Sequence, residues 1–299
     1  MNNRNRQSGF SLLEMLLAMA LGLIVVTGIV QLFIGNSQSA NIISGQARLQ
    51  ENARFAFEFI STAARRAGYF GCIRDDQTRV WGLNGAPAQL PEYNVDQSVG
   101  GFDANGDGTW TPSTLNLPGG TPGNTNAGNG INLGSVDQNS DIVVFRNLRQ
   151  PTQRLTVVAQ PLDDVTISAP GGDPGFGQDD IVMVADCEQS AAYRVTNVIP
   201  AGANEVTLQN AANTGGTSAF FQNAALVTPP AGPQVNFTKS FLGRSYGTDS
   251  VVGAVEATYF FVADSLRNNN VGDTPLSLWQ KVGPDAPVEL IQGVENMQI

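Results

Sequence analysis

A long apolar stretch near the N-terminus constrains this chain of 299 residues more than any other feature. The segment before it is short and polar and carries the positive charges of Arg4 and Arg6, and the apolar residues then run from Phe10 to Ile34. About twenty such residues form a helix that can span a bilayer, and arginine on one side keeps that side cytoplasmic. We therefore predict that residues 10–34 enter a membrane as a helix.

Three other interpretations of this stretch are a buried core helix, a cleaved secretory signal peptide and a plain single-pass anchor. An uncharged run of this length is rare in a soluble core. The sequence Ala18-Met19-Ala20 has the small residues of a signal-peptide cleavage site, but the apolar run continues for fourteen residues beyond it. The plain anchor therefore remains the alternative to a processed segment.

Glu14 lies five residues into the apolar stretch, where a carboxylate costs roughly 3 kcal/mol unless a partner is supplied. It belongs to the run Gly9–Glu14 (GFSLLE), which closely resembles the type IV prepilin processing motif. The resemblance implies that a prepilin peptidase cuts after Gly9, so that residues 1–9 are a leader, and methylates the new amine of Phe10. It also implies that Glu14 pairs with the N-terminal amine of a neighbouring subunit and so sets the register of a filament.

Helical periodicity continues beyond the apolar stretch. Apolar side chains recur three, four or seven residues apart at Ile42, Leu49, Ala53, Ala56, Ile60, Ala63 and Ala67. We predict one helix from Phe10 to Gly68, roughly 90 Å long at about 1.5 Å per residue. Its second half, residues 35–68, is amphipathic and packs on the rest of the chain. Three of the helix's glycines, Gly22, Gly28 and Gly35, are places where it can bend or melt.

Two further runs resemble the PilW group of minor pilins, namely Ala47–Ala56 (ARLQENARFA) and Arg65–Cys72 (RRAGYFGC). The same residues also describe an ordinary amphipathic helix with a C-terminal glycine at Gly68. The resemblance implies a minor pilin that primes pilus assembly and takes part in tip assembly. The implied partners are the prepilin peptidase, other minor pilins, the major pilin, the assembly machinery of the bacterial inner membrane and a tip adhesin.

The resemblance also implies a location. The chain would first be a single-pass inner-membrane protein with its head in the periplasm, and would later belong to a pilus on the cell surface. Three alternatives remain open: a type II secretion pseudopilin, a membrane-anchored adhesin or binding module, and an anchored hydrolase that uses carboxylates. The first shares the leader and the helix, the second needs no cut after Gly9, and the third needs two converging acids.

The charged residues argue against several classes of function. The formal charge is −10 and the chain has only two lysines, Lys239 and Lys281, so a nucleic-acid partner is not expected. The absence of histidine removes the usual general base and the usual zinc ligand. Adjacent acids in a strand point to opposite faces, so three pairs are predicted to be solvated turn positions: Asp75-Asp76, Asp163-Asp164 and Asp179-Asp180. We predict a protein that is not an enzyme and requires no cofactor.

The chain has two cysteines, Cys72 and Cys187. An even number of cysteines in an exported chain favours a disulfide, because oxidising compartments keep such bonds intact. In the chain-entropy model a bridge over so long a loop contributes roughly 4 to 5 kcal/mol. Two buried free thiols are the alternative.

The run Asp103–Thr109 (DANGDGT) matches the first seven positions of a calcium-binding loop. The expected oxygen ligands are Asp103, Asn105, Asp107 and Thr109. Position twelve is Thr114 where a glutamate is usual, so an outside carboxylate would have to complete the shell, from Glu92, Asp96 or Asp137. Because Asp-Gly and Asn-Gly pairs also simply form turns, the pattern predicts a weak and optional Ca²⁺ site.

Residues 69–299 are expected to form a head. Short β-branched runs bounded by turn residues predict strands at 142–145, 155–159, 165–168, 181–185, 193–198, 205–208, 255–262 and 288–294. Residues 75–138 show no sustained periodicity and are expected to be extended surface loops. A mainly antiparallel sheet packed on the outer half of the helix gives an α+β fold. The final run, 289–299, looks like an unfinished strand, so the resemblance implies a head truncated at its C-terminus.

Overall fold

A computed structural model describes residues 11–73, 78–84, 93–111, 136–211, 223–224, 226–227, 235–236, 242–269, 272–283 and 285–299. The chain divides into two compact units, one that ends at Arg54 and one that runs from Phe55 to Ile299. The helix is α1 (Leu12–Arg66). The strands are β1 (Thr78–Trp81), β2 (Val99–Ala104), β3 (Trp110–Thr111), β4 (Ile142–Leu148), β5 (Gln153–Arg154), β6 (Val165–Ser168), β7 (Ile181–Ala185), β8 (Gln189–Arg194), β9 (Asn197–Gly202), β10 (Glu205–Gln209), β11 (Leu226–Val227), β12 (Val235–Asn236), β13 (Val251–Asp264), β14 (Leu276–Val282) and β15 (Val288–Gln292).

Helix α1 is continuous over 55 residues. The helix does not melt at Gly22, Gly28 or Gly35, which all lie within it. The helix ends at Arg66, two residues before the predicted end. Gly68 follows it with a φ of +80°, a conformation that favours glycine, and a Cβ there would lie 3.0 Å from the Ser98 Oγ. The Gly68 N–H donates to the Arg146 carbonyl at 2.8 Å, which connects the helix exit directly to β4.

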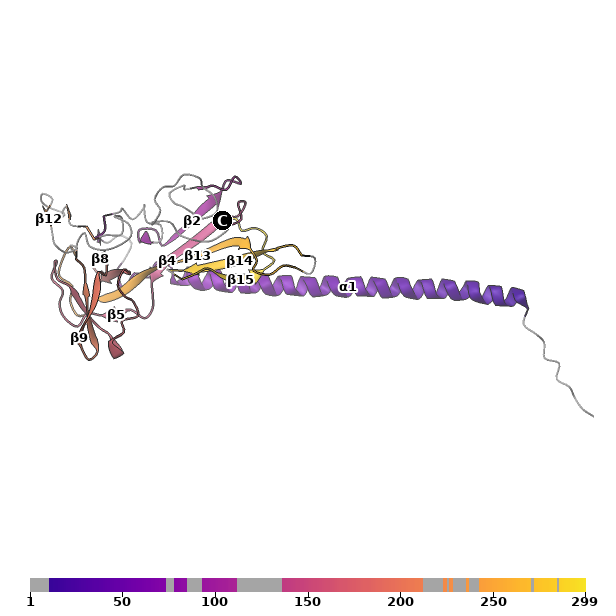
Figure 1. The fold of residues 1–299 in the computed structure, drawn as a ribbon, viewed down its shortest axis with the longest axis horizontal. Helices are drawn as coiled ribbons and strands as arrows, with labels where there is room; N and C mark the ends of the chain where they lie inside the picture. The colour runs from indigo at the N-terminus through magenta and orange to yellow at the C-terminus, as the bar shows by residue number, and fades with distance from the viewer. Residues whose placement is uncertain are drawn as a thin grey trace, which may run out of the picture. The chain divides into compact units, whose positions relative to one another are not determined.

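The second unit is built on a sheet to which ten described strands belong (Figure 1). Strand β13 is its centre: its first residues pair with β5 and β7, its middle with β4 and its second half with β14, all antiparallel. In the described part of the chain only β1 and β8 pair in parallel. All residues of β4 and β7 are buried, as expected for strands covered on both faces. The structure thus confirms a mainly antiparallel α+β fold.

The end of α1 packs on one face of this sheet within the second unit. Figure 1 shows α1 running alongside β14 and β15. The contacting side chains of the helix are Ala56, Ile60, Ala63 and Ala67, which are part of the predicted apolar stripe. Three of the four are alanines, so the helix backbone can approach the sheet closely. On the sheet side they meet Val143, Phe145, Phe260, Leu278 and Ile291.

A smaller antiparallel sheet, in the order β6-β10-β9, forms what we call the outer lobe (Figure 1). Its inward side chains alternate with exposed or half-buried ones and join a hydrophobic cluster that includes Tyr193 and Tyr246. The second unit therefore contains one core beneath α1 and another beneath the outer lobe.

Several predicted strands differ in detail. Residues 155–159 form no strand: Leu155 and Ala159 make isolated bridges, while Val157 and Val158 between them are exposed. The predicted strand 193–198 is split between β8 and β9, because Val195 and Thr196 bond to the Asp180 and Gln209 carbonyls instead. The predicted strand 288–294 ends at Gln292, before Gly293 turns with a φ of +87°.

The loop prediction for 75–138 is wrong where the structure describes that region, because it contains β1, β2 and β3. Strand β2 has the sequence VGGFDA, and its glycines hide the usual strand pattern. The glycines ease the close approach of β2 to β4: a Cβ at Gly100 would lie 3.2 Å from the Arg146 Nη1, and one at Gly101 would lie 3.3 Å from the Ile142 carbonyl oxygen.

Candidate assembly site

The first turn of α1 follows directly on the predicted cleavage point. Gly9 and Phe10 lie outside the described residues, so cleavage and methylation there stay predictions. The Ser11 carbonyl accepts hydrogen bonds from the N–H groups of Glu14 at 3.0 Å and Met15 at 3.2 Å. Glu14 is therefore held in the first turn, at the helix end whose free N–H groups favour a negative charge.

Glu14 and the apolar side chains around it are exposed. Leu12, Leu13, Ile24 and Phe33 expose 77%, 68%, 69% and 74% of their surface, and every residue from 12 to 34 is exposed. Among the residues that the structure describes, none forms an ion pair with Glu14. Leaving a large apolar side chain in water instead of burying it forgoes about 1.5–3 kcal/mol. This segment therefore needs a lipid or protein environment that the described residues of the chain do not supply.

The composition of α1 satisfies the requirements for crossing a membrane. It is the one described helix that is long and apolar enough, with a mean hydropathy of 2.5 over its most apolar window. The polar hydroxyl within it, that of Thr27, donates to the Leu23 carbonyl at 2.7 Å and so needs no external partner. An exposed apolar span with a carboxylate in its first turn can bind lipid and then other helices of the same kind.

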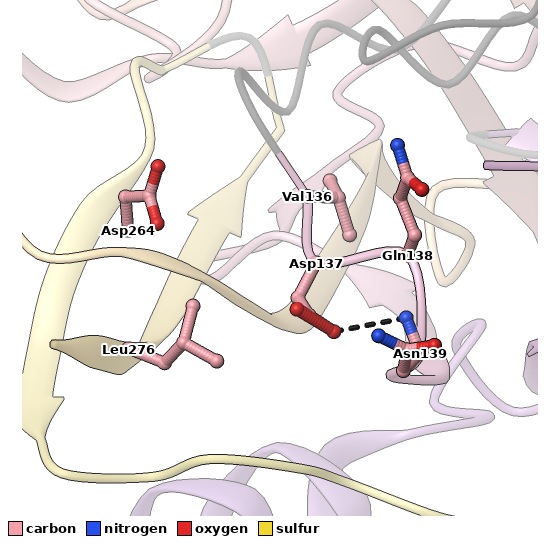
Figure 2. A pocket seen from close by; sticks show the side chains of 6 residues that line it. All are labelled: Val136, Asp137, Gln138, Asn139, Asp264 and Leu276. Atoms are coloured by element: carbon pink, nitrogen blue, oxygen red, sulfur yellow. Dashed lines mark hydrogen bonds between the residues drawn. The ribbon is translucent and has the colours of Figure 1, made fainter. Parts of the chain in front are cut away.

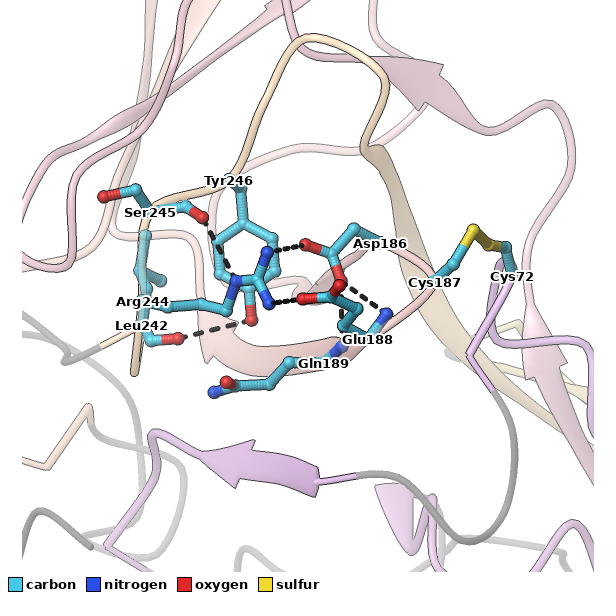
Figure 3. Close-up of polar contacts among 9 residues, drawn as sticks. All are labelled: Cys72, Asp186, Cys187, Glu188, Gln189, Leu242, Arg244, Ser245 and Tyr246. Atoms are coloured by element: carbon cyan, nitrogen blue, oxygen red, sulfur yellow. Dashed lines mark hydrogen bonds and ion pairs between the residues drawn. A yellow bond between two sulfur atoms is a disulfide. The ribbon is translucent and has the colours of Figure 1, made fainter.

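The predicted disulfide connects the helix exit to the turn between β7 and β8 (Figure 3). Cys72 and Cys187 are bonded, with their Cα atoms 4.8 Å apart and 115 residues between them in sequence. Both residues are exposed, so the alternative of buried thiols does not describe this structure. The bond ties the end of α1 to the main sheet.

The same turn is held from its other side by Arg244, which the sequence does not single out (Figure 3). Its guanidinium forms ion pairs with Asp186, at 3.1 Å, and with Glu188. Asp186 also accepts the N–H groups of Glu188 and Gln189, each at 2.8 Å. Hydrogen bonding to Glu188 is the main reason that the pKa of Arg244 is raised. The turn is thus fixed covalently on one side and by charge on the other.

The predicted calcium ligands lie on the hairpin that joins β2 and β3. The Asp107 carboxylate accepts the side-chain O–H and the N–H of Thr109, at 2.5 and 2.9 Å, and these bonds hold the pKa of Asp107 below its ordinary value. Asn105 donates to the Thr109 hydroxyl at 2.9 Å. No group of three or more acidic or cysteine side chains suited to a metal occurs within the described ranges. The Ca²⁺ site stays a prediction.

The three carboxylates that could complete the calcium site, those of Glu92, Asp96 and Asp137, make other contacts or fall outside the described residues. Asp96 lies 3.5 Å from Arg79, and Glu92 falls outside the described residues. Asp137 lines a surface hollow of about 260 Å³ together with Asp264 (Figure 2). Its carboxylate accepts the Asn139 N–H at 2.9 Å. Asp264 is exposed, so this hollow does not enclose a pair of acids and gives the hydrolase interpretation no support.

The adjacent acids have individual structural roles. Asp163 and Asp164 accept backbone N–H groups in turns, as predicted. Asp179 pairs with the buried Arg194, and Asp180 pairs with Arg149 at 2.9 Å. Asp179 lies in a turn and its side chain is 61% exposed, as predicted. The prediction of a solvated position is wrong for Asp180, whose side chain is 29% exposed, because Arg149, the residue after β4, pairs with it. Asp75 and Asp76 lie outside the described residues.

Comparison with known proteins finds a similarity in the N-terminal segment of the chain. A family model described as the prokaryotic N-terminal methylation motif matches residues 4–30. The match covers residues 4–9 of the predicted leader, the predicted cleavage point, Glu14 and most of the apolar span. No curated protein and no solved structure matches the chain.

Proposed function

We propose that this chain, whose methylation motif and α+β fold support a type IV pilin-like or pseudopilin protein, is a PilW-like minor pilin. After removal of residues 1–9 and methylation of Phe10, it takes part in priming and tip assembly of a type IV pilus. Its partners are the prepilin peptidase, other minor pilins and the major pilin, the assembly machinery and a tip adhesin.

One observation carries this proposal. The motif runs into a helix whose residues 12–34 are all exposed and whose first turn carries Glu14. A bilayer covers such side chains first, and neighbouring subunits cover them once a filament forms. In both environments a positive charge opposite Glu14 lowers the cost of burying its carboxylate. The new N-terminal amine of a neighbouring subunit supplies such a charge.

The architecture of the second unit supports a role at the tip. The end of α1 packs on the side of the main sheet that carries β14 and β15, whereas the outer lobe packs on β7, β8 and β13 around a separate cluster and so enlarges the head. A filament forms when each subunit binds the next through a contact that does not close into a ring, so its assembly needs a first subunit. A subunit with a shared helix and an enlarged head can start the array without being its repeating unit.

The proposal predicts a specific mature N-terminus. In membranes from cells with the prepilin peptidase, the intact mass corresponds to a chain that begins at methylated Phe10. In cells without the peptidase the mass includes residues 1–9. A chain that keeps residues 1–9 in both strains would contradict processing and return the protein to a plain anchored module.

A second measurement separates a pilus from a secretion pseudopilus, which share leader and helix. The mature protein is expected in pili sheared from the cell surface, at a small fraction of the major pilin. Its absence from sheared pili, with co-purification instead with type II secretion subunits, would favour the pseudopilin.

A further inference from the structure

The chain leaves α1 along the edge of β4, through residues 67–73, which we call the exit segment. The Arg146 N–H donates to the carbonyl of the residue before β2, and the Arg146 carbonyl accepts the Gly68 N–H, each at 2.8 Å. The Leu148 N–H then donates to the Tyr69 carbonyl, also at 2.8 Å. The exit segment therefore pairs with the edge of β4 that β2 occupies earlier along the same strand.

The exit segment passes from one face of the main sheet to the other. Ala67 packs with the end of α1 on the cluster that contains Phe145, whereas Phe70 belongs to the cluster that contains Leu148. Successive side chains of a strand point to opposite faces, so Phe145 and Leu148, three positions apart on β4, lie on opposite faces of the sheet. The chain thus crosses the sheet at its edge within three residues.

Phe70 anchors the exit segment on the second face. It is only 1% exposed, and its cluster includes side chains of β4, β7, β8 and β13. The guanidinium carbon of Arg79 lies 5.6 Å from the centre of its ring. Gly71 follows with a φ of +86°, and a Cβ there would lie 2.8 Å from the Val251 Cγ2 and 3.1 Å from the Ala185 Cβ. The exit segment therefore fits tightly against β7 and β13.

A covalent connection follows this non-covalent one. Cys72 comes two residues after Phe70 and is bonded to Cys187, 115 residues later in the sequence, in the turn between β7 and β8 (Figure 3). Both of these strands have a neighbour on either side, because β8 lies between β1 and β7, and β7 lies between β8 and β13. The disulfide thus attaches the exit segment to interior strands of the main sheet.

The packed face of α1 offers less resistance to a pull along the helix. The side chains by which it contacts the sheet are three alanines and Ile60. Such small side chains project little from the helix, so they interlock weakly with the sheet when the helix is drawn along its own axis. Tension on α1 is therefore resisted mainly at the exit segment.

We propose that the exit segment and the disulfide together form a two-stage load-bearing junction between α1 and the second unit. Under tension the exit segment detaches first, because backbone bonds to β4 and the burial of Phe70 hold it. The disulfide then stops the chain at Cys72 and passes the load to the turn between β7 and β8. Strands β1 to β7, which lie between the two cysteines in sequence, are thereby kept out of the path of the force.

This inference rests on the proposed function only for the source of the load, since a membrane or filament holds α1 while the head binds other molecules. Single-molecule force spectroscopy of the full chain in detergent micelles tests it directly. The handles are attached through a non-canonical amino acid at Arg48 of α1 and at Ala203 in the turn between β9 and β10, which are both exposed. Neither handle uses a cysteine, so the disulfide stays intact.

The second stage is tested by comparing the protein with and without its disulfide. In the oxidised wild type the first transition is expected to release no more chain than the stretch from Arg48 to Cys72. In the doubly substituted Cys72→Ser, Cys187→Ser variant this transition is expected to run past residue 72 and to lengthen by up to 115 residues, roughly 400 Å at about 3.5 Å per residue. Wild-type protein treated with a phosphine reductant, which reaches the two exposed cysteines, is expected to behave like this variant and shows the result without a substitution.

The first stage is tested by two phenylalanine variants. Phe70→Ala is expected to speed the first transition at constant force at least tenfold, because it removes the buried anchor. Phe57→Ala, in the same helix but 73% exposed, is expected to leave that rate unchanged. The proposal is overturned if the reduced protein has a first transition of the same length as the oxidised one, or if Phe70→Ala and Phe57→Ala detach at the same rate. These outcomes concern the isolated chain, so they are distinct from a failure of leader processing, which the N-terminal mass reports.

Discussion

Glu14 occupies the first turn of α1, one turn after the predicted cleavage point and with its side chain exposed. The helix dipole favours its negative charge, but in lipid the dipole does not replace a counter-ion. The side chain is thus suited to pair with a group on another chain rather than to stabilise its own helix.

We predict that Glu14→Ala leaves leader cleavage intact and reduces incorporation into pili by tenfold or more, because about 1.4 kcal/mol of lost pairing corresponds to a factor of ten. The measurement is the amount of the variant in sheared pili relative to the amount in membranes. Glu51→Ala is the matched control, because Glu51 is an exposed carboxylate of the same helix outside the apolar span. Equal incorporation of Glu14→Ala and Glu51→Ala would contradict a registration role.

The apolar stripe of α1 packs against the sheet over one part of the helix and is exposed over another. Ala56, Ile60, Ala63 and Ala67 pack on the sheet, whereas Ile42 and Leu49 expose 60% and 69% of their surface. Ala53 is also exposed, although it continues the same stripe. The periodicity identifies one face of the helix, and the length of the sheet decides how much of that face is covered.

Ile60 and Phe57 provide a comparison within this helix. Ile60→Asp is expected to destabilise the second unit by about 2 kcal/mol, because it places a charge against Phe145 and Phe260. Phe57→Asp is expected to change this stability by less than about 0.5 kcal/mol, because Phe57 is 73% exposed. Denaturant unfolding followed by tryptophan fluorescence measures both, since Trp81, Trp110 and Trp279 all lie in the second unit. Equal losses in the two variants would show that the helix does not pack as described.

The turn between β7 and β8 is a second element with a testable role. Replacing Cys72 and Cys187 with serine is expected to lower the unfolding free energy of the second unit by about 4 kcal/mol in the chain-entropy model. Arg244→Ala removes the ion pairs on the other side of the turn and is expected to cost about 1 kcal/mol, because water reaches the side chains of Arg244 and Glu188, which are 39% and 73% exposed, although that of Asp186 is only 11% exposed. Comparable losses in the two variants, measured by denaturant unfolding, would mean that the disulfide is not the main tie of this turn.

At the scale of the whole molecule, the two units have opposite relations to solvent. Residues 12–34 expose their apolar side chains, while the second unit buries its own around β13 and beneath the outer lobe. The first unit therefore requires a bilayer or a filament, and the second resembles a water-soluble domain in its burial.

This contrast predicts how the protein fractionates. The full chain is expected to stay with membranes in high salt and at alkaline pH and to be released by detergent, because apolar burial rather than charge holds it there. Ile24→Lys is expected to weaken the association, since a charge near the centre of the span costs roughly 3 kcal/mol. Release of the wild type by salt alone would mean that the apolar helix does not enter the bilayer.

The sequence by itself determined the properties that depend on local pattern. The apolar span, the position of Glu14, the helix end near Gly68 and the strands at 142–145, 165–168 and 181–185 follow from hydrophobicity, periodicity and turn chemistry, which act over a few neighbouring residues. The pairing of Cys72 with Cys187 follows from their number, because two cysteines allow a single bridge within the chain.

Only the tertiary structure decided which distant residues meet. The glycine-rich β2 becomes a strand because β4 offers it a partner. Asp179 and Asp180 become ion-pair members because the fold places beside them Arg194, the last residue of β8, and Arg149, which follows β4. The burial of Phe70 depends on side chains of β4, β7 and β8, all of which come much later in the chain. Such contacts arise from sheet pairing over long sequence separations, which no local pattern encodes.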